Sequence, residues 1–263
     1  MATAPTFTTL KIIVDQRIAI LEFARPNSLN ALSRQCLSEL ITASTWLGQQ
    51  NEVRVVVIRG QGRAFCAGFD LNDFATADPN ISEHATADLG RLATEALTNI
   101  PQVTIAAIHG HCVGGGVVLA SACDLRVASD DTRFSIPEVD LGIPLAWGGI
   151  PRLVREIGPT VTRELVLTCR EFDANEAKQL RFVNTVVPRS DLETHVGDLA
   201  RSLATKSALV LQMTKAAVNQ AMEEVLSTAG AIGDADKLVA ATHDAESRAA
   251  GTAYLDGRKR KPR

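Results

Sequence analysis

Two glycine-containing segments carry the residue types from which a catalytic site could be built. One runs over 60–71 and the other over 109–116, and each follows an apolar run that predicts a buried strand. Glycine lets the backbone come close to a ligand and direct its N–H groups at it. Two such N–H groups converging on one oxygen would form an oxyanion hole. Tight turns with nothing bound are the alternative interpretation of either segment taken alone.

The elements that must hold these segments alternate between strands and helices. Strands are predicted over 7–14, 18–23, 53–58, 103–108, 125–128 and 182–187. Helices are predicted after the N-cap candidates Ser33 and Ser82, and over 114–122, 148–157, 159–168, 173–180, 191–206, 209–226 and 234–250. Strand–helix alternation followed by long helices indicates an α/β body with an α-helical C-terminal segment.

The composition is typical of a globular chain and argues against several classes. Of 263 residues, 46% are hydrophobic and 22% are charged, which suits one large domain with or without a small appendage. The net charge of −3 gives no electrostatic basis for binding nucleic acid. Five cysteines without a C-x-x-C pair argue against a disulfide framework or a zinc cluster, so a cytoplasmic location is expected.

Membrane insertion and metal binding are not expected. The first residues lack the basic start and the apolar run of a secretory signal. The uncharged window 103–123 is long enough to span a bilayer, but His109, His111 and four glycines make it a poor membrane helix. These two histidines lack a third ligand at a recognisable spacing, so packing or turn roles are expected for them.

Six short motifs follow one another along about the first 190 residues. They are A-R-P-N-S-L-N-A-L at 24–32, A-F-C-A-G-F-D-L at 64–71, A-A-I-H-G-H-C-V-G-G-G at 106–116, C-D-L-R at 123–126, P-E-V-D-L-G at 137–142 and F-D-A-N-E-A-K at 172–178. In this order and at this spacing they resemble the crotonase (enoyl-CoA hydratase/isomerase) superfamily.

The resemblance implies a crotonase-like spiral of ββα repeats followed by an α-helical C-terminal segment. Residues 1–190 would form the core that binds the acyl-CoA, and residues 191–263 would form a helical trimerisation segment. A homo-oligomer is therefore expected, either a trimer or a dimer of trimers. The resemblance implies an acyl-CoA substrate, so that coenzyme A enters as part of the thioester, with no permanently bound cofactor and no metal.

The resemblance also assigns roles to the glycine segments and to the P-E motif. The backbone N–H groups of Phe69 and Gly115 fall at the positions that hold the thioester carbonyl in the family. The helix opening near Gly115 would add the positive end of its dipole. Glu138 falls at an acid–base position, and its apolar neighbours are expected to raise its pKa.

Further positions match those that contact the acyl-CoA in the family. They are Arg25, Ser28, Leu29, Ala67, Asp70, Leu71, Val118, Leu141, Trp147 and Lys259. Arg25 could equally be a surface arginine, and the basic end 258–263 that contains Lys259 could simply be solvated. Trp147 is expected to shape the acyl pocket, because it lies in the same loop as Glu138.

Two departures from the family narrow the chemistry. Its hydratases use two glutamates, and the second position is Val118 here, which can neither accept nor donate a proton. Several other branches use an aspartate where this chain has Ala146. One carboxylate with an oxyanion hole can still shift a proton along a 3-enoyl thioester, which favours a Δ3,Δ2-enoyl-CoA isomerase. An enoyl-CoA hydratase and a non-catalytic acyl-CoA-binding protein are the alternatives.

Overall fold

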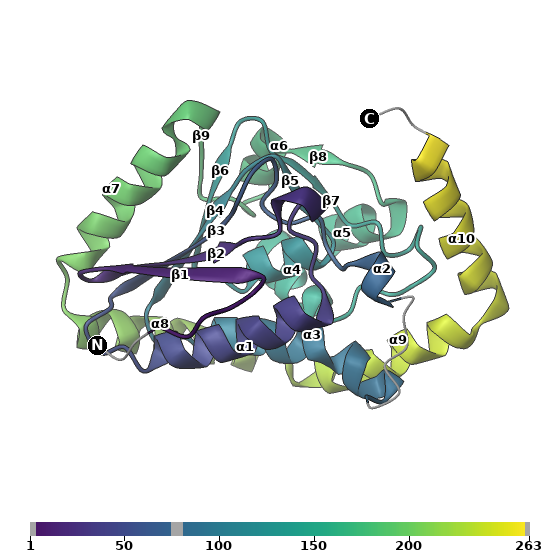
Figure 1. The fold of residues 1–263 in the computed structure, drawn as a ribbon, viewed down its shortest axis with the longest axis horizontal. Helices are drawn as coiled ribbons and strands as arrows, with labels where there is room; N and C mark the ends of the chain where they lie inside the picture. Colours follow the sequence, from purple (N-terminus) through teal and green to yellow (C-terminus); the bar gives the residue numbers. More distant parts are fainter. Residues whose placement is uncertain (1–3, 75–80, 261–263) are drawn as a thin grey trace.

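The larger of two sheets positions the glycine segments. A computed structural model describes residues 4–74 and 81–260, and the larger sheet in this part has six strands (Figure 1). In sheet order they are β1 (Leu10–Asp15), β2 (Ile18–Phe23), β3 (Val55–Gly60), β4 (Val103–Ile108), β6 (Leu125–Ser129) and β9 (Thr185–Val187). β1 and β2 form an antiparallel hairpin, and the other neighbouring pairs are parallel. The β-branched run of β3 lies in the middle of the sheet with helices on both faces, as expected for a parallel strand.

A smaller sheet holds the second glycine segment. Its three strands are β5 (His111–Val113), β7 (Arg133–Ser135) and β8 (Phe172–Asp173). β5 also pairs with the first glycine segment, because the Cys66 amide donates to the His111 carbonyl at 3.0 Å and the Val113 amide donates to the Cys66 carbonyl at 2.9 Å. These three short strands were not predicted from the sequence.

Ten α-helices complete the described chain. They are α1 (Arg34–Gly48), α2 (Leu71–Phe74), α3 (Glu83–Thr98), α4 (Gly115–Ser121), α5 (Gly149–Thr168), α6 (Ala174–Gln179), α7 (Leu192–Ala204), α8 (Ala208–Val225), α9 (Asp234–His243) and α10 (Ala245–Arg260). Short 3-10 turns lie at 26–28, 189–191 and 229–233. Among these described helices, none combines the length and the apolar character needed to cross a membrane.

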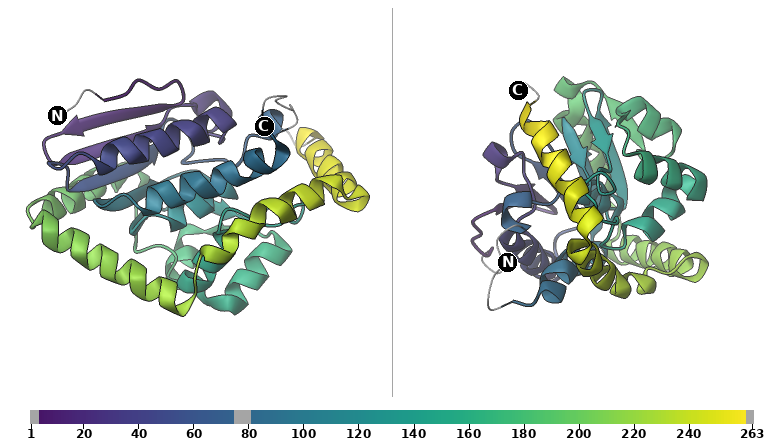
Figure 2. Two further views of the ribbon diagram at one scale, coloured as in Figure 1. Left: turned by 90° about the horizontal axis from the view of Figure 1, so that it is seen from below. Right: turned by 90° about the vertical axis from the view of Figure 1, so that its right-hand side faces the viewer.

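Helices cover both faces of the large sheet because the strand side chains alternate between them. Val57 and Ala107 pack with Val196 of α7 on one face. Val56 and Ile108 belong to the larger core on the other face, where α1, α3 and α4 lie. Figure 2 shows α1 and α3 side by side, with α9 continuing along α3. The fold therefore matches the predicted α/β body followed by helices.

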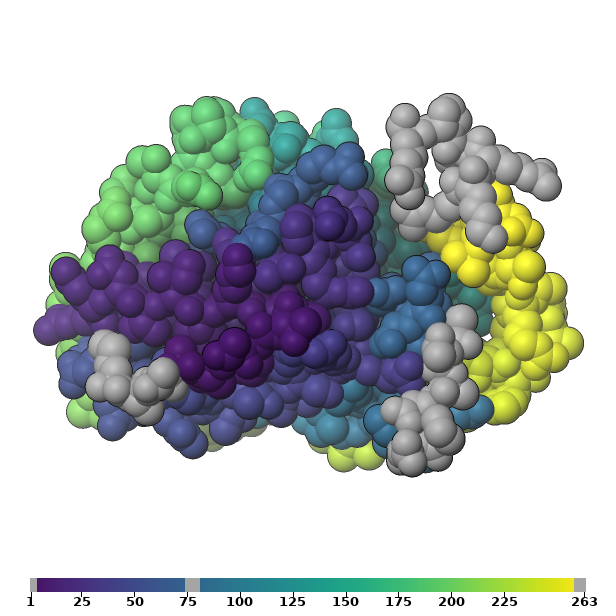
Figure 3. Space-filling model, in the orientation of Figure 1, coloured from purple at the N-terminus to yellow at the C-terminus, as the bar shows by residue number. Residues whose placement is uncertain are grey.

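The C-terminal helices depart from the prediction of one helix over 234–250. α9 ends at His243, and Asp244 has an extended backbone with ψ 135°. Its carboxylate accepts a hydrogen bond from the Ser247 amide at 2.8 Å, so that Asp244 begins a second helix. This second helix, α10, forms one end of the molecule (Figure 3).

Other predicted strand starts are wrong. The strand predicted over 182–187 starts at Thr185, because the amides of Phe182 and Val183 donate to the carbonyl of Ala177 beside α6. The first hairpin strand starts at Leu10 rather than at residue 7. By contrast, the break between the helices predicted over 148–157 and 159–168 is confirmed, because Gly158 inside α5 has a non-helical backbone with φ 76°.

Both predicted serine caps are confirmed. The Ser33 hydroxyl accepts a hydrogen bond from the Cys36 amide at 3.2 Å, and the Ser82 hydroxyl accepts one from the Ala85 amide at 3.1 Å. Each bond satisfies an amide that has no partner inside its helix.

Replacing Ser33 by alanine is expected to lower the free energy of unfolding by about 1 kcal/mol, because the Cys36 amide loses its acceptor. Ser207 provides a matched control, since it precedes α8 without a side-chain capping bond. Urea denaturation of Ser33→Ala and Ser207→Ala measures the difference. Equal losses in the two variants would contradict the capping role of Ser33.

Candidate active site

The two glycine segments meet beside Gly68. Hydrogen bonds from Leu32 to the Gly68 carbonyl and from Asp70 to the Leu32 carbonyl, at 2.8 and 3.0 Å, hold the chain on either side of Phe69. A Cβ atom added to Gly68 would lie 2.8 Å from the Val113 carbonyl oxygen and 3.7 Å from the Gly115 nitrogen. The structure therefore brings the neighbour of Phe69 against the start of α4. That the two amides hold a carbonyl oxygen stays a prediction.

Glu138 lies against the same turn. Gly114 has φ 50°, and a Cβ atom at this position would overlap Glu138 Oε1. Only glycine fits both the backbone conformation and the space. The Glu138 loop is held by its own turns, since Leu141 donates to the Pro137 carbonyl at 3.0 Å and Ile143 donates to the Glu138 carbonyl at 2.9 Å. The loop therefore holds the Glu138 carboxyl group beside Gly114, the residue that precedes Gly115.

Burial dominates the electrostatics of the Glu138 carboxyl group. The residue as a whole is partly exposed, but its Oε2 atom is shielded from solvent and has no hydrogen-bond partner among the described residues. Desolvation raises the pKa of Glu138 to about 7, and only a bond from its own backbone amide acts in the other direction. The raised pKa agrees with the apolar neighbours seen in the sequence.

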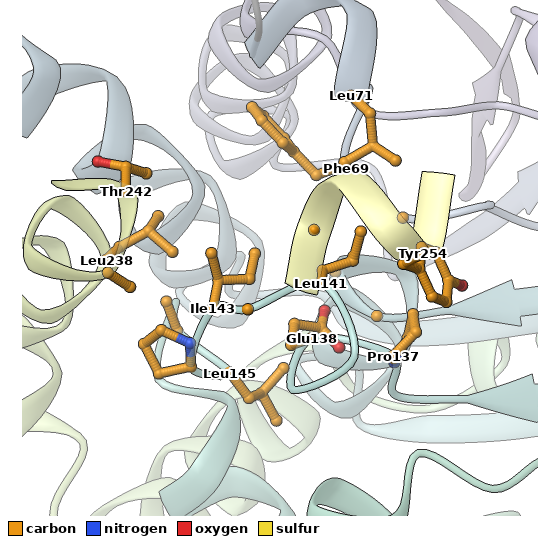
Figure 4. A pocket seen from close by; sticks show the side chains of 18 of the residues that line it. Phe69, Leu71, Pro137, Glu138, Leu141, Ile143, Leu145, Leu238, Thr242 and Tyr254 are labelled. Carbon is orange, nitrogen blue, oxygen red and sulfur yellow. The ribbon is translucent and has the colours of Figure 1, made fainter. Parts of the chain in front are cut away.

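A cavity of about 610 Å³ joins Glu138 to both glycine segments (Figure 4). Its walls come from 67–71, 113–118 and 137–147, and from helices α3, α9 and α10. Of the predicted substrate-binding residues, the following line it: Ala67, Leu71, Val118, Leu141 and Trp147. Phe69, Gly115 and Glu138 line it too. Glu138 is the only carboxylate among the described residues of this lining.

Sequence reasoning missed the far walls of the cavity. Ile143 and Leu145 come from the Glu138 loop, Leu238 comes from α9, and Tyr254 comes from α10 (Figure 4). Apolar spacing places such residues on a buried helix face, but it does not tell which cavity that face meets. A Cβ atom on Gly251 of α10 would lie 2.8 Å from the carbonyl oxygen of Leu141. Gly251 is therefore the feature of this helix in the sequence that could have indicated a close contact between α10 and the Glu138 loop.

Arg25 and Asp70 contact one another rather than the cavity. Arg25 Nη2 donates to Asp70 Oδ2 at 2.8 Å, and Arg25 also donates to the Ala31 carbonyl. Ser28 is exposed and Leu29 is half-buried, and neither lines the cavity. Lys259 belongs to α10, but its side chain lies outside the described part of the chain. Contacts of these residues with coenzyme A stay predictions.

His109 is held by the first glycine segment. Its Nε2 atom donates to the Gly62 carbonyl at 3.1 Å, and burial together with nearby Arg189 lowers its pKa. Within residues 4–74 and 81–260, no group of three or more histidine, cysteine, aspartate or glutamate side chains could hold a metal ion. Cys66 is buried, and burial raises the pKa of its thiol to about 12, which disfavours the reactive thiolate.

Replacing Glu138 by glutamine is expected to stabilise the protein at alkaline pH only. Because the folded-state pKa lies near 7 and the ordinary value is 4.5, the folded protein binds the proton more tightly than the unfolded chain does. Wild type therefore loses stability as the pH rises from 5 to 8, by roughly 2–3 kcal/mol relative to Glu138→Gln.

Urea denaturation of both proteins at pH 5 and pH 8 tests this difference. Glu52→Gln changes an exposed glutamate and serves as the control. A constant difference between wild type and Glu138→Gln at the two pH values would contradict the assigned pKa.

Comparison with known proteins extends over most of the chain. The family model described as enoyl-CoA hydratase/isomerase matches residues 14–262. The crotonyl-CoA hydratase of Syntrophomonas wolfei is 33% identical over 250 residues, with 93% of this chain and 94% of that protein covered. A peroxisomal Delta(3,5)-Delta(2,4)-dienoyl-CoA isomerase of Arabidopsis thaliana is 37% identical over 238 residues, with 84% and 85% covered.

The same likeness holds in three dimensions. The crystal structure of an enoyl-CoA hydratase from Bacillus anthracis superposes with a TM-score of 0.78 at 28% identity, covering 97% of this chain and 98% of that one. The family match spans both glycine segments, the Glu138 loop and the helices that close the cavity. The chain therefore belongs to the enoyl-CoA hydratase/isomerase family, the crotonase superfamily that its motifs resemble.

Proposed function

We propose that the protein is a Δ3,Δ2-enoyl-CoA isomerase that uses Glu138 as its only acid–base group. The observation that carries this proposal is that Glu138 is the only carboxylate among the described residues that line the cavity. The Oε2 atom of Glu138 is shielded from solvent, and burial raises the pKa of this residue to about 7. Val118 lies in the same lining, at the position where the family's hydratases have a second glutamate. A carboxyl group with this pKa takes up and returns a proton with little bias at neutral pH.

The proposed reaction moves one proton and one double bond. The Glu138 carboxylate removes a proton from C2 of a 3-enoyl thioester, and the C–H electron pair delocalises onto the thioester oxygen as a dienolate. The amides of Phe69 and Gly115 donate hydrogen bonds to that oxygen. The neutral Glu138 then returns the proton to C4 while the new double bond forms between C2 and C3. Atoms and charge balance, and no other reactant is needed.

Hydration is the alternative within the family, since the relative from Syntrophomonas wolfei is named a crotonyl-CoA hydratase. Adding water across C2 and C3 requires a polar group that holds and activates the water. Val118 is 1% exposed and cannot do this. Another relative is named a dienoyl-CoA isomerase. That branch of the family has an aspartate where this chain has Ala146, so its reaction is not favoured here. A binding protein without turnover is the alternative from another class.

Wild type is expected to convert 3-hexenoyl-CoA to the 2-enoyl isomer, with kcat/KM falling as the pH drops below about 7. Glu138→Gln is expected to lower kcat by about 10²–10⁴, because the base is lost. Absorbance of the conjugated product measures both effects. Hydration of crotonyl-CoA at a comparable rate would instead support a hydratase, and tight binding of both thioesters without turnover would support a binding protein.

Val118 provides a second test of the same assignment. Val118→Glu restores the second carboxylate of the hydratases and is expected to raise the rate of crotonyl-CoA hydration. Val118→Gln has nearly the same volume without the charge and is the matched control. An equal hydration rate in the two variants would contradict the role assigned to the missing carboxylate.

We further propose that the helical segment 191–263 associates with other copies of this chain. All eighteen residues of α8 are described, and none of them is buried. The large apolar side chains that α8 leaves exposed are Leu209, Val210, Met213, Val218 and Val225. Exposed apolar surface of this extent is typical of subunit contacts. A trimer or a dimer of trimers would cover it.

Light scattering is expected to give a particle mass of three or six chains for wild type. Replacing Leu209 and Met213 together by glutamate is expected to shift the protein towards single chains, because two charges would be buried at the interface. Leu167→Glu changes a similarly exposed residue of α5, outside the segment, and is the control. A wild-type particle of one chain would contradict the proposal.

A further inference from the structure

Trp147 has an unusual backbone conformation for a large side chain. Its φ is 62°, and the next residue, Gly148, has φ 71°. The Gly149 amide donates to the Ala146 carbonyl at 3.0 Å, so that residues 146–149 form a tight turn with two left-handed central residues. The left-handed position at residue 147 is one that glycine or asparagine normally fills. The residue is nevertheless almost fully buried, with an exposed fraction of 9%.

The turn is also fixed from outside the Glu138 loop. The Gly148 amide donates to Asp234 Oδ2 at 3.0 Å, and Asp234 is the first residue of α9. Lys237 Nζ donates to the other oxygen of the same carboxylate at 3.1 Å. The direction of the Trp147 side chain is therefore set by the hydrogen bond within the turn and by the contact of the turn with α9.

Two glycines make room for the indole. A Cβ atom on Gly90 of α3 would overlap Cε2, Cδ2 and Nε1 of Trp147. A Cβ atom on Gly115 would lie 3.0 Å from Cη2 and 3.2 Å from Cε3 of the same side chain. The pyrrole side of the indole thus rests on α3, and its benzene side rests on the first residue of α4.

The same indole also touches the first glycine segment. The rings of Trp147 and Phe69 meet edge to face, with centroids 5.8 Å apart and planes at 85°. Trp147 is therefore in contact with the backbone of Gly115 and with the side chain of Phe69. These are the two residues whose amides are assigned to the thioester oxygen.

We propose that Trp147 is a positioning residue that holds the amides of Phe69 and Gly115 at the spacing required by the thioester oxygen. The slot over Gly90 fixes the indole, and the indole fixes the two donors. The inference rests on the proposed function, because it assumes that these amides bind the carbonyl. It differs from the expectation that Trp147 mainly shapes the acyl pocket, which would make its effect depend on chain length.

Trp147→Phe and Gly90→Ala test the inference from two sides. The first shortens the indole, and the second displaces it from a position outside the cavity lining. Gly197→Ala is the matched control, since Gly197 also lies inside a helix but an added Cβ would meet only the flexible end of Arg201, at 3.2 Å. Far-UV circular dichroism confirms that each variant is folded before its kinetics are measured.

Both test variants are expected to lower kcat by about tenfold or more while KM changes by less than about threefold, because the lost interaction acts mainly in the transition state. The loss should be the same for 3-butenoyl-CoA and 3-octenoyl-CoA. Wild-type kcat in Trp147→Phe and Gly90→Ala, or a loss confined to the longer substrate, would overturn the inference.

Binding of acetoacetyl-CoA gives a readout that is independent of turnover. Its enolate absorbs in the near ultraviolet, and donors to the thioester oxygen favour that form. Trp147→Phe should reduce the enolate signal while leaving the affinity for free coenzyme A unchanged. If wild type binds acetoacetyl-CoA with this signal but converts no enoyl-CoA, the proposed function fails and the inference stands. An unchanged signal in Trp147→Phe overturns the inference alone.

Discussion

The site depends on the backbone pairing of the two glycine segments around Cys66 and Cys112. Backbone hydrogen bonds of 3.0 and 2.9 Å join Cys66 to His111 and Val113, just before the turns at Gly68 and Gly114. The two turns therefore lie side by side. Both turns have left-handed backbones, and both lie too close to neighbouring atoms to accept a side chain. Because the pairing uses main-chain atoms, the geometry depends on few side chains. Glu138 packs against the turn at Gly114, and Trp147 packs against it at Gly115.

The absence of a second carboxylate at Val118 affects the proton chemistry proposed for Glu138. A second carboxylate within the same apolar cavity would repel the first and would hold water. With Val118 in its place, burial is the largest influence on the pKa of Glu138 and raises it to about 7. Among the side chains that the structure describes around the cavity, Glu138 is therefore the one suited to exchange a proton at neutral pH. The cost of this arrangement is a carboxylate that lacks a partner above that pH, which the rest of the core must offset.

The sequence predicted what is local and missed what depends on tertiary packing. Ser33 and Ser82 predict the starts of their helices because a cap acts within four residues. Gly68 and Gly114 likewise predict turns, because the preference of glycine for a positive φ is local. The break at Asp244 was missed although its cap at Ser247 is also local, because apolar spacing continues through it. The left-handed backbone of Trp147 costs about 1–3 kcal/mol, and no local rule predicts it, since Asp234 of α9 stabilises the turn from 86 residues away.

The contact between α10 and the Glu138 loop links the end of the chain to its centre. Leu141 and Gly142 lie against the backbone of residues 247 and 251, and the helix contributes Tyr254 to the wall beside the carboxyl group. During synthesis, Glu138 leaves the ribosome more than a hundred residues before this helix does. Until α10 docks, one wall between that side chain and water is absent. The burial that raises the pKa of Glu138 is thus complete only once α10 has been synthesised and has docked.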